Sequence, residues 1–201
     1  MNEFPIIPEK TAMLFFDTLN GSNPEGLAAL RAAGYVDRLV QIEQACRKAG
    51  IAIFYTLPEH RKDGKDWGLT VVGDPPEVTY FKGVNYKGSR HATILDDIAP
   101  QPHDYIITKH RWNSFFQTCL ELSQRTAGVD TILMAGGATH IGIASTAYSA
   151  RDYSYSQIIL SDAIHGSPAI DAFFLEKVFP SFCRVMTVEE TIASFAVPAM
   201  A

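Results

Sequence analysis

Residues 131–161, TILMAGGATHIGIASTAYSARDYSYSQIILS, decide the fold class of this chain. The apolar run Thr131–Ala135 predicts a buried strand, Gly136–Gly137 a tight turn, Ile141–Asp152 a helix and Gln157–Ser161 a second buried strand. Strands that are apolar on both faces are typical of a parallel sheet covered by helices. This stretch therefore predicts one strand–helix–strand unit of an α/β protein.

The same alternation continues along the chain on both sides of this unit. Further strands are predicted at Thr11–Phe16, Ile51–Thr56, Tyr105–Thr108 and Cys183–Met186. Further helices are predicted at Gly26–Ala49, Phe115–Ala127, Ile170–Phe179 and Val188–Phe195, with a weak one near Ala92–Ile98. Six strands in this order predict a three-layer, doubly wound, Rossmann-like parallel sheet whose carboxyl edge binds ligands.

Composition narrows the class of protein further. The chain has 201 residues, 47% hydrophobic and 19% charged, with a formal net charge of −5, so we expect one folded domain over residues 1–201. With no basic tract and no long apolar run, we expect neither nucleic acid nor a membrane as a partner. The first residues, MNEFPIIPEK, lack a secretory signal, and three distant cysteines predict no disulfide framework. A cytoplasmic location is expected.

The interval Leu57–Asp104 breaks the alternation. It contains glycine, proline, charged and aromatic residues without strong periodicity. A stretch of this length that follows a strand is typical of a lid or binding loop, and a decorated surface loop is the alternative. Its charge run at Arg61, Lys62 and Lys65 is either a solvated face or a source of positive charge for an anionic substrate.

Two charged residues follow predicted strands. Asp17 ends the first strand and Lys109 ends the third. Alone, each is as compatible with a turn aspartate or a solvated lysine as with a site. Because the carboxyl ends of parallel strands meet at one edge, we expect the two side chains to lie within about 4 Å, or to be joined by one water. The pair is the first site candidate.

The turn Gly136–Gly142 offers a second feature at this edge. It lacks the spacing of a dinucleotide fingerprint and the lysine of a phosphate-binding loop. A glycine-rich turn that leads into a helix can direct backbone N–H groups at an anion or oxyanion. A plain strand-to-helix turn is the alternative that the residues leave open.

Three blocks together resemble the isochorismatase-like hydrolases, the superfamily that includes nicotinamidases and N-carbamoylsarcosine amidase. They are MLFFD with Asp17, TKHRWNSFF with Lys109, and the stretch from Gly136 to Ile164 around Gly142; RVMTVEETI resembles the family's last strand and helix. The resemblance extends from about residue 11 to residue 193. It implies an Asp–Lys–Cys triad, but the third position is Gly142, and Cys46, Cys119 and Cys183 lie elsewhere, each expected to be a small core residue.

With glycine at position 142 the chain resembles the isochorismatase branch of the superfamily, in which a glycine occupies the cysteine position. That resemblance implies hydrolysis of a vinyl ether, with Asp17 as the acid, Lys109 as its partner and Gly142 leaving room for substrate or water. The resemblance also implies a non-proline cis peptide at Gly137–Ala138. Substrate contacts are expected from Ala138, Thr139, His140, Ile141 and Trp112, and from Arg61 as a source of positive charge that has no aligned counterpart in that branch. No cofactor is expected. The nicotinamidase metal site, an Asp and two His near the second strand, has no match, and His60 alone does not predict one.

Three functions stay open at this point. The first is a cysteine-free hydrolase that cleaves a vinyl ether or a similar bond in a small anionic substrate. The second is an amide hydrolase of the same fold that uses water activated by Asp17. The third is a catalytically inactive binding or assembly module. The resemblance also implies a homodimer or a higher homo-oligomer.

Overall fold

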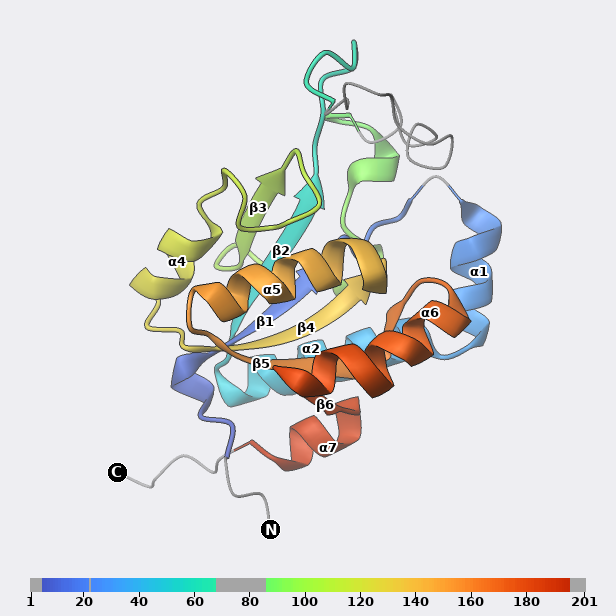
Figure 1. Ribbon diagram of the computed structural model, residues 1–201. Coiled ribbons are helices and arrows are strands. Elements are labelled where there is room, and N and C mark those ends of the chain that lie inside the picture. The colour runs from blue at the N-terminus through green and yellow to red at the C-terminus, as the bar shows by residue number, and fades with distance from the viewer. Residues whose placement is uncertain (1–4, 22, 68–85, 196–201) are drawn as a thin grey trace.

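The fold is built on one parallel sheet of six strands. The computed structural model describes residues 5–21, 23–67 and 86–195. The strands are β1 (Thr11–Phe16), β2 (Ala52–Pro58), β3 (Tyr105–Lys109), β4 (Thr131–Gly137), β5 (Ser156–His165) and β6 (Arg184–Met186). Their order is β3-β2-β1-β4-β5-β6, and every neighbouring pair is parallel. The predicted six-stranded parallel sheet is confirmed (Figure 1).

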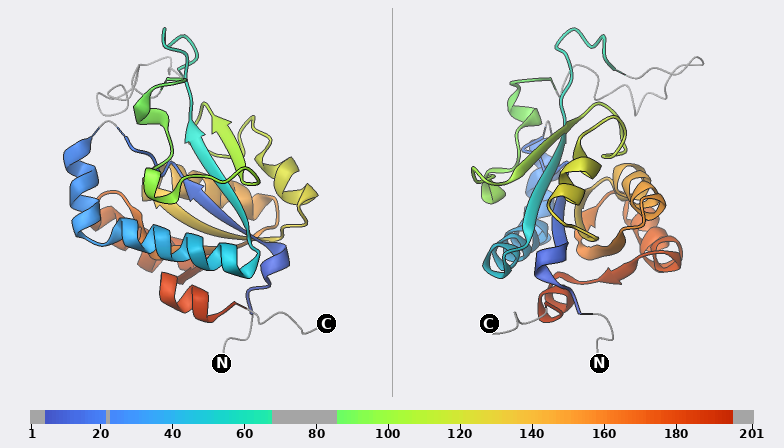
Figure 2. Two further views of the ribbon diagram at one scale, coloured as in Figure 1. Left: turned by 180° about the vertical axis from the view of Figure 1, so that it is seen from behind. Right: turned by 90° about the vertical axis from the view of Figure 1, so that its left-hand side faces the viewer.

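Helices cover both faces of the sheet, as predicted (Figure 2). Their bounds are α1 (Pro24–Ala32), α2 (Tyr35–Ala49), α4 (Leu120–Thr126), α5 (Ala144–Asp152), α6 (Pro168–Phe173) and α7 (Val188–Ala193). Alternate residues of β1 divide between the two cores. Met13 and Phe15 pack with α2 on one face, whereas Leu14 and Phe16 pack with α4 and α5 on the other. Period-2 alternation in a strand that is buried on both sides explains this division.

The strand order fixes where a ligand can bind. β1 has β2 on one side and β4 on the other. The strands β1 to β3 are thus added toward one edge of the sheet and β4 to β6 toward the other, and the topological switch point lies between β1 and β4. In open α/β sheets the crevice at this reversal, outside the carboxyl ends of the strands, is the usual ligand site. Asp17 follows β1 and the segment from Ala138 to Gly142 follows β4, so both lie at this point. The tight turn predicted at Gly136–Gly137 is wrong, because β4 extends through both glycines.

Several helices are shorter than the sequence predicts. The helix expected over Gly26–Ala49 is two helices, because Gly34 adopts a φ of 77° between α1 and α2. The helix expected from Phe115 begins only at Leu120, after Gln117 with a φ of 54°. A left-handed residue ends regular helical hydrogen bonding, and apolar periodicity alone does not reveal it.

Two more segments depart from regular α-helix. The helix expected over Ile170–Phe179 is α6 followed by a wider helical turn at Phe174–Val178 and a 3-10 turn at Phe179–Ser181. The weak helix expected near Ala92–Ile98 is a pair of 3-10 turns, Arg90–Ala92 and Asp96–Ile98. Short turns of this kind carry too little periodicity for a helix prediction to place them.

The predicted lid or binding loop can be followed only in part, because residues 68–85 of the interval Leu57–Asp104 lie outside the described residues. Its last part lies against the chain that follows β1. Leu19 pairs with Ile94 in an isolated bridge, and Asn20 donates to Thr93 Oγ1 and to the carbonyl oxygen of Ile94, each at 2.9 Å. This end of the interval is therefore tied to the sheet edge that carries Asp17.

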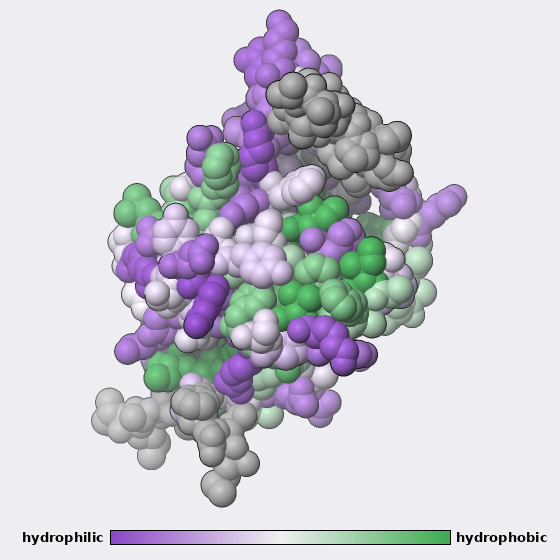
Figure 3. Space-filling view, in the orientation of Figure 1, coloured by the Kyte–Doolittle hydropathy of each residue, from purple (hydrophilic) through white to green (hydrophobic). Residues whose placement is uncertain are grey.

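The outer surface combines polar and apolar regions. Figure 3 shows hydrophobic side chains gathered over α5 and α6, where Ile170 and Phe173 are among the exposed large hydrophobic residues. Trp112 and Phe116 are exposed after β3 as well, whereas Phe115 is buried. Among the described residues, none of the helices has both the length and the apolar character that crossing a membrane requires.

Candidate active site

The carboxyl ends of β1 and β3 bring Asp17 and Lys109 into contact. Lys109 Nζ lies 2.8 Å from Asp17 Oδ2 and donates a hydrogen bond to it. The strand order places β2 between their strands, and the long lysine side chain spans that distance while only 3% exposed. The Asp17 backbone N–H donates to the carbonyl oxygen of Thr56 at the end of β2. The predicted carboxylate–ammonium pair is confirmed.

The environment of Asp17 favours its protonated form. Burial raises the pKa of Asp17 above its usual value, because the carboxylate loses water, and Lys109 opposes this shift through its charge and its hydrogen bond. Asp17 Oδ1 is buried and has no hydrogen-bond partner among the described residues. One oxygen is thus fixed by the lysine and the other is left for a ligand. Such an arrangement suits a group that gives or takes a proton.

The Phe16 ring occupies the position at which a nucleophile would lie. A Cβ atom built on Gly142 would overlap Cε1 and Cζ of this ring and would lie 3.3 Å from Cδ1. Phe16 is only 1% exposed, and Lys109 Nζ lies over its face at 4.4 Å from the ring centroid, a cation–π geometry. The expectation that Gly142 leaves room for substrate or water is therefore wrong. The aromatic ring of the residue before Asp17 fills that space.

The turn after β4 has the predicted backbone form. The peptide between Gly137 and Ala138 is cis, as the resemblance implied. Gly136 has a φ of 125°, and a Cβ atom there would overlap the carbonyl group of Phe16, so only glycine lets β1 and β4 approach so closely. The three N–H groups of residues 141–143 all donate to the carbonyl oxygen of Ala138. These three are engaged in their own turn, so the anion cradle is not formed by them.

Two side chains of this turn keep unused hydrogen-bonding atoms. Thr139 Oγ1 and His140 Nδ1 are both buried and without a hydrogen-bond partner among the described residues. Thr139 is fully buried, and His140 and Ile141 are half-buried. A buried polar atom without a partner requires an explanation, and a ligand contact is one. A contact of Thr139 or His140 with a substrate stays a prediction.

Comparison with known proteins agrees with this geometry. Residues 11–190, about nine-tenths of the chain, match the family model described as the isochorismatase domain. The chain belongs to the isochorismatase family. It is a hydrolase of that family, and the family resemblance seen in the sequence is confirmed.

Two curated relatives match most of this isochorismatase-family protein. The isochorismatase family protein YwoC of Bacillus subtilis is 31% identical over 194 residues, which cover 94% of this chain and 96% of YwoC. The ureidoacrylate amidohydrolase RutB of Variovorax paradoxus is 32% identical over 182 residues, 82% of this chain and 70% of RutB.

Solved structures show the same fold. A cysteine hydrolase from Pseudomonas syringae pv. phaseolicola superposes with a TM-score of 0.80 at 24% identity, over 96% of this chain and 95% of its own. N-carbamoylsarcosine amidase from Thermoplasma acidophilum superposes with a TM-score of 0.71 at 21% identity, over 94% of this chain and 99% of its own. At these identities the likeness concerns the fold alone.

The cysteines of this isochorismatase-family protein do not replace the missing thiol. Cys46 is fully buried in α2, as expected, and burial raises its thiol pKa. Cys183 is half-buried, and burial raises the pKa of its thiol to about 12. Cys119 is exposed before α4, so its expected place in the core is wrong. A thiol pKa raised by burial disfavours the thiolate that attacks a carbonyl carbon.

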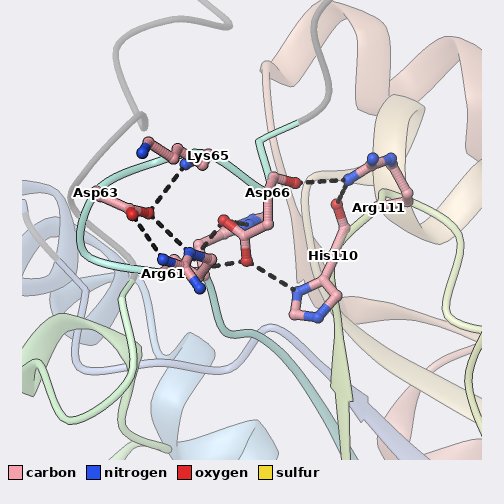
Figure 4. Close-up of polar contacts among 7 residues, drawn as sticks. Arg61, Asp63, Lys65, Asp66, His110 and Arg111 are labelled. Carbon is pink, nitrogen blue, oxygen red and sulfur yellow. Dashed lines mark hydrogen bonds and ion pairs between the residues drawn. The ribbon is translucent and has the colours of Figure 1, made fainter.

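The other two predicted substrate residues lie on loops. Trp112 follows β3 and is 57% exposed. Arg61 follows β2, and its exposed guanidinium is bound by both oxygens of Asp63 at 2.9 and 2.7 Å (Figure 4). Arg61 is thus held within its own loop, and a contact with substrate stays a prediction for both residues.

Sequence reasoning missed two features of this region. Phe16 was assigned to a buried strand, and only the close approach of Gly142 shows what its ring excludes. His60 was judged to be alone, yet Asp66 and His110 lie beside it, with ligand atoms of all three residues within 4.8 Å of one another. The one signal in the sequence is that His110 directly follows Lys109, which places His110 at the same carboxyl edge of the sheet.

Proposed function

We propose that this protein cleaves a vinyl ether or a similar bond in a small anionic substrate, with Asp17 as general acid and without a covalent thiol intermediate. One observation carries the proposal: the Phe16 ring fills the nucleophile position, next in the chain to a half-buried aspartic acid whose pKa is raised. A proton donor and an electrostatic partner are retained, whereas the space for a nucleophile is closed. Vinyl-ether hydrolysis needs the first two and not the third.

The proposed reaction assigns different roles to the two oxygens of Asp17. Oδ1 accepts no hydrogen bond from the part of the chain that the structure describes and carries the proton, and Oδ2 stays bound to Lys109. Transfer of the proton to the enol carbon leaves a carboxylate on Asp17 and an oxocarbenium ion on the substrate. Lys109 stabilises that carboxylate. Water then adds to the oxocarbenium carbon, a proton returns to Asp17, and the resulting hemiketal collapses to a ketone and an alcohol.

Substrate binding is assigned to the turn after β4. The free atoms Thr139 Oγ1 and His140 Nδ1 supply hydrogen bonds, and the half-buried Ile141 supplies an apolar contact. Trp112 and Arg61 extend the proposed contacts to the loops, where Arg61 meets an anionic group only by giving up Asp63. An anionic substrate therefore competes only with a solvent-exposed ion pair, which is weak because water screens it.

Amide hydrolysis is the second candidate, because relatives such as RutB of Variovorax paradoxus are named as amidohydrolases. Asp17 would then act as a base on water, in its carboxylate form. The two candidates differ in their pH dependence. An acid works below its pKa, so activity falls as pH rises through the raised pKa of Asp17; a base works above that pKa, so activity rises over the same range.

A substrate panel tests the proposal. Isochorismate and a set of small amides, including ureidoacrylate, are offered to the wild-type protein and to Asp17→Asn, and product is measured by chromatography. We expect turnover of the vinyl ether and a loss of at least ~10²-fold in Asp17→Asn, the low end for general acid catalysis. Turnover of amides alone favours the second candidate. No turnover of any compound by a folded protein favours an inactive binding module and contradicts the proposal.

A further inference from the structure

Three potential metal ligands meet at the carboxyl ends of β2 and β3. His60 follows β2, Asp66 lies in the loop after it, and His110 follows β3 immediately after Lys109. His60 Nδ1 lies 3.6 Å from Asp66 Oδ1, and His110 Nδ1 lies 3.8 Å from Asp66 Oδ2. The carboxylate is therefore placed between two imidazole rings that both present Nδ1 to it. Figure 4 shows His110 directed at Asp66.

These separations suit a bridging ion better than direct hydrogen bonds. Both exceed 3.5 Å, whereas a charge-assisted N–H···O bond is about 2.7–2.9 Å long. Two atoms bound to one zinc ion at about 2.1 Å in tetrahedral geometry lie roughly 3.4 Å apart. The ligand atoms thus need only a small closure. His110 is 56% exposed and free to make it, while His60 is held in place by burial.

His60 carries an independent sign of a ligand. It is only 7% exposed, and its Nδ1, which faces the carboxylate, is buried without a hydrogen-bond partner among the described residues. A neutral imidazole with a free nitrogen is the form that binds metal.

Two of the positive charges around the cluster are paired with carboxylates. Arg61 is paired with Asp63, and Lys87 lies 3.4 Å from Glu59. Among the described residues, no lysine or arginine side chain makes a salt bridge to Asp66, whose two oxygens accept from the Arg61 backbone N–H at 3.0 Å. The carboxylate keeps its charge for a cation.

Arg111 ties the two halves of the cluster together. Its Nη1 donates to the carbonyl oxygen of His110 at 2.6 Å and to that of Asp66 at 3.2 Å (Figure 4). This bridge joins the end of β3 to the loop after β2, so His110 and Asp66 are held at one place. The cluster also lines a cavity of about 640 Å³, which leaves room for water or a ligand atom beside an ion.

We propose that His60, Asp66 and His110 bind one divalent transition-metal ion, with an open coordination position toward the cavity. Two imidazoles and one carboxylate are a donor set for zinc and for its first-row neighbours. The set differs from the nicotinamidase pattern, whose donors all lie near the second strand, because His110 comes from β3. The proposal rests on this cluster alone and does not depend on the reaction proposed for Asp17.

Calorimetric titration of the full chain with Zn²⁺, after treatment with a chelator, tests the site. We expect one saturable ion per chain and a zinc-dependent rise in the unfolding temperature. Because loss of a residue that only supports a ligand costs about 10–100-fold in affinity, loss of a ligand should cost at least ~100-fold.

The variants separate this site from accidental binding. His110→Ala and Asp66→Asn change partly exposed side chains, so the fold should survive where His60→Ala threatens it. The matched control is His103→Ala, which removes an exposed histidine 3.8 Å from Asp104 but without a third ligand. Zinc binding should fall ~100-fold in the first two variants and stay unchanged in the control. No saturable binding, binding that survives both ligand variants, or equal loss in the control would overturn the proposal.

Discussion

Replacing Gly142 by alanine tests whether the Phe16 ring closes the nucleophile position. The new Cβ would overlap two ring carbons, far inside the ~3.5–4.0 Å at which carbon atoms pack. The ring cannot move away easily, because it is buried among Leu14, Ile143 and other core residues and carries Lys109 Nζ on its face. Such overpacking costs roughly 1–3 kcal/mol of stability.

The sign of this effect makes the test decisive. Gly142 lies in the helical turn before α5, where alanine without a clash would gain up to about 1 kcal/mol over glycine. Urea unfolding of Gly142→Ala should therefore show a loss of stability where helix propensity alone predicts a gain. In a Phe16→Leu background the shorter side chain vacates the space, so the same substitution should become neutral or stabilising, with a coupling of about 1–3 kcal/mol. A Gly142→Ala protein as stable as wild type, with Phe16 intact, would refute the reasoning.

Three further predictions concern the same site and the assembly of the chain. Lys109→Met should destabilise the protein at pH 7 in urea unfolding, because it leaves the Asp17 carboxylate unpaired. The Asp17 side chain is 21% exposed, so the loss should be up to about 3 kcal/mol, the lower end for a buried pair. Since removing Lys109 raises the pKa of Asp17 further, the destabilisation should grow as pH rises through the range above the usual aspartate pKa and vanish in acid, where the group is protonated in both states. Replacing Cys46, Cys119 and Cys183 by alanine or serine should leave turnover within a few-fold, and alkylation that abolishes turnover of a folded protein would revive thiol catalysis. Sedimentation at micromolar concentration should give a dimer or a larger oligomer, and a monomer would contradict that expectation.

The sequence was sufficient for the sheet and for the acid–lysine pair. Runs such as Thr11–Phe16, apolar on both faces, leave few alternatives to a covered parallel sheet, and parallel strands bring their carboxyl ends to one edge. The contact between Asp17 and Lys109 could thus be predicted from the sequence alone. The sequence did not predict that the Phe16 ring lies against Gly142. The direction of that ring depends on the close approach of β1 and β4 and on the turn at Gly142.

The histidine cluster was missed for a different reason. Its members are separated by up to 50 residues, and the loop after β2 has no periodicity that fixes its path. The bridge between His60 and Tyr86 and the contacts of Arg111 place that loop against β3, and such contacts depend on tertiary structure. Local patterns predict strands and helices well, whereas a loop is positioned by partners that are distant in sequence.

The pH dependence of kcat/KM tests the central claim, that Asp17 acts as an acid without a thiol. On a vinyl-ether substrate, wild-type activity should be full at low pH and fall as pH rises through the Asp17 pKa, which lies above the usual aspartate value. Asp17→Asn should lose at least ~10²-fold and also lose this limb of the profile. A profile that instead rises with pH, or an Asp17→Asn protein that retains wild-type turnover, would contradict the account.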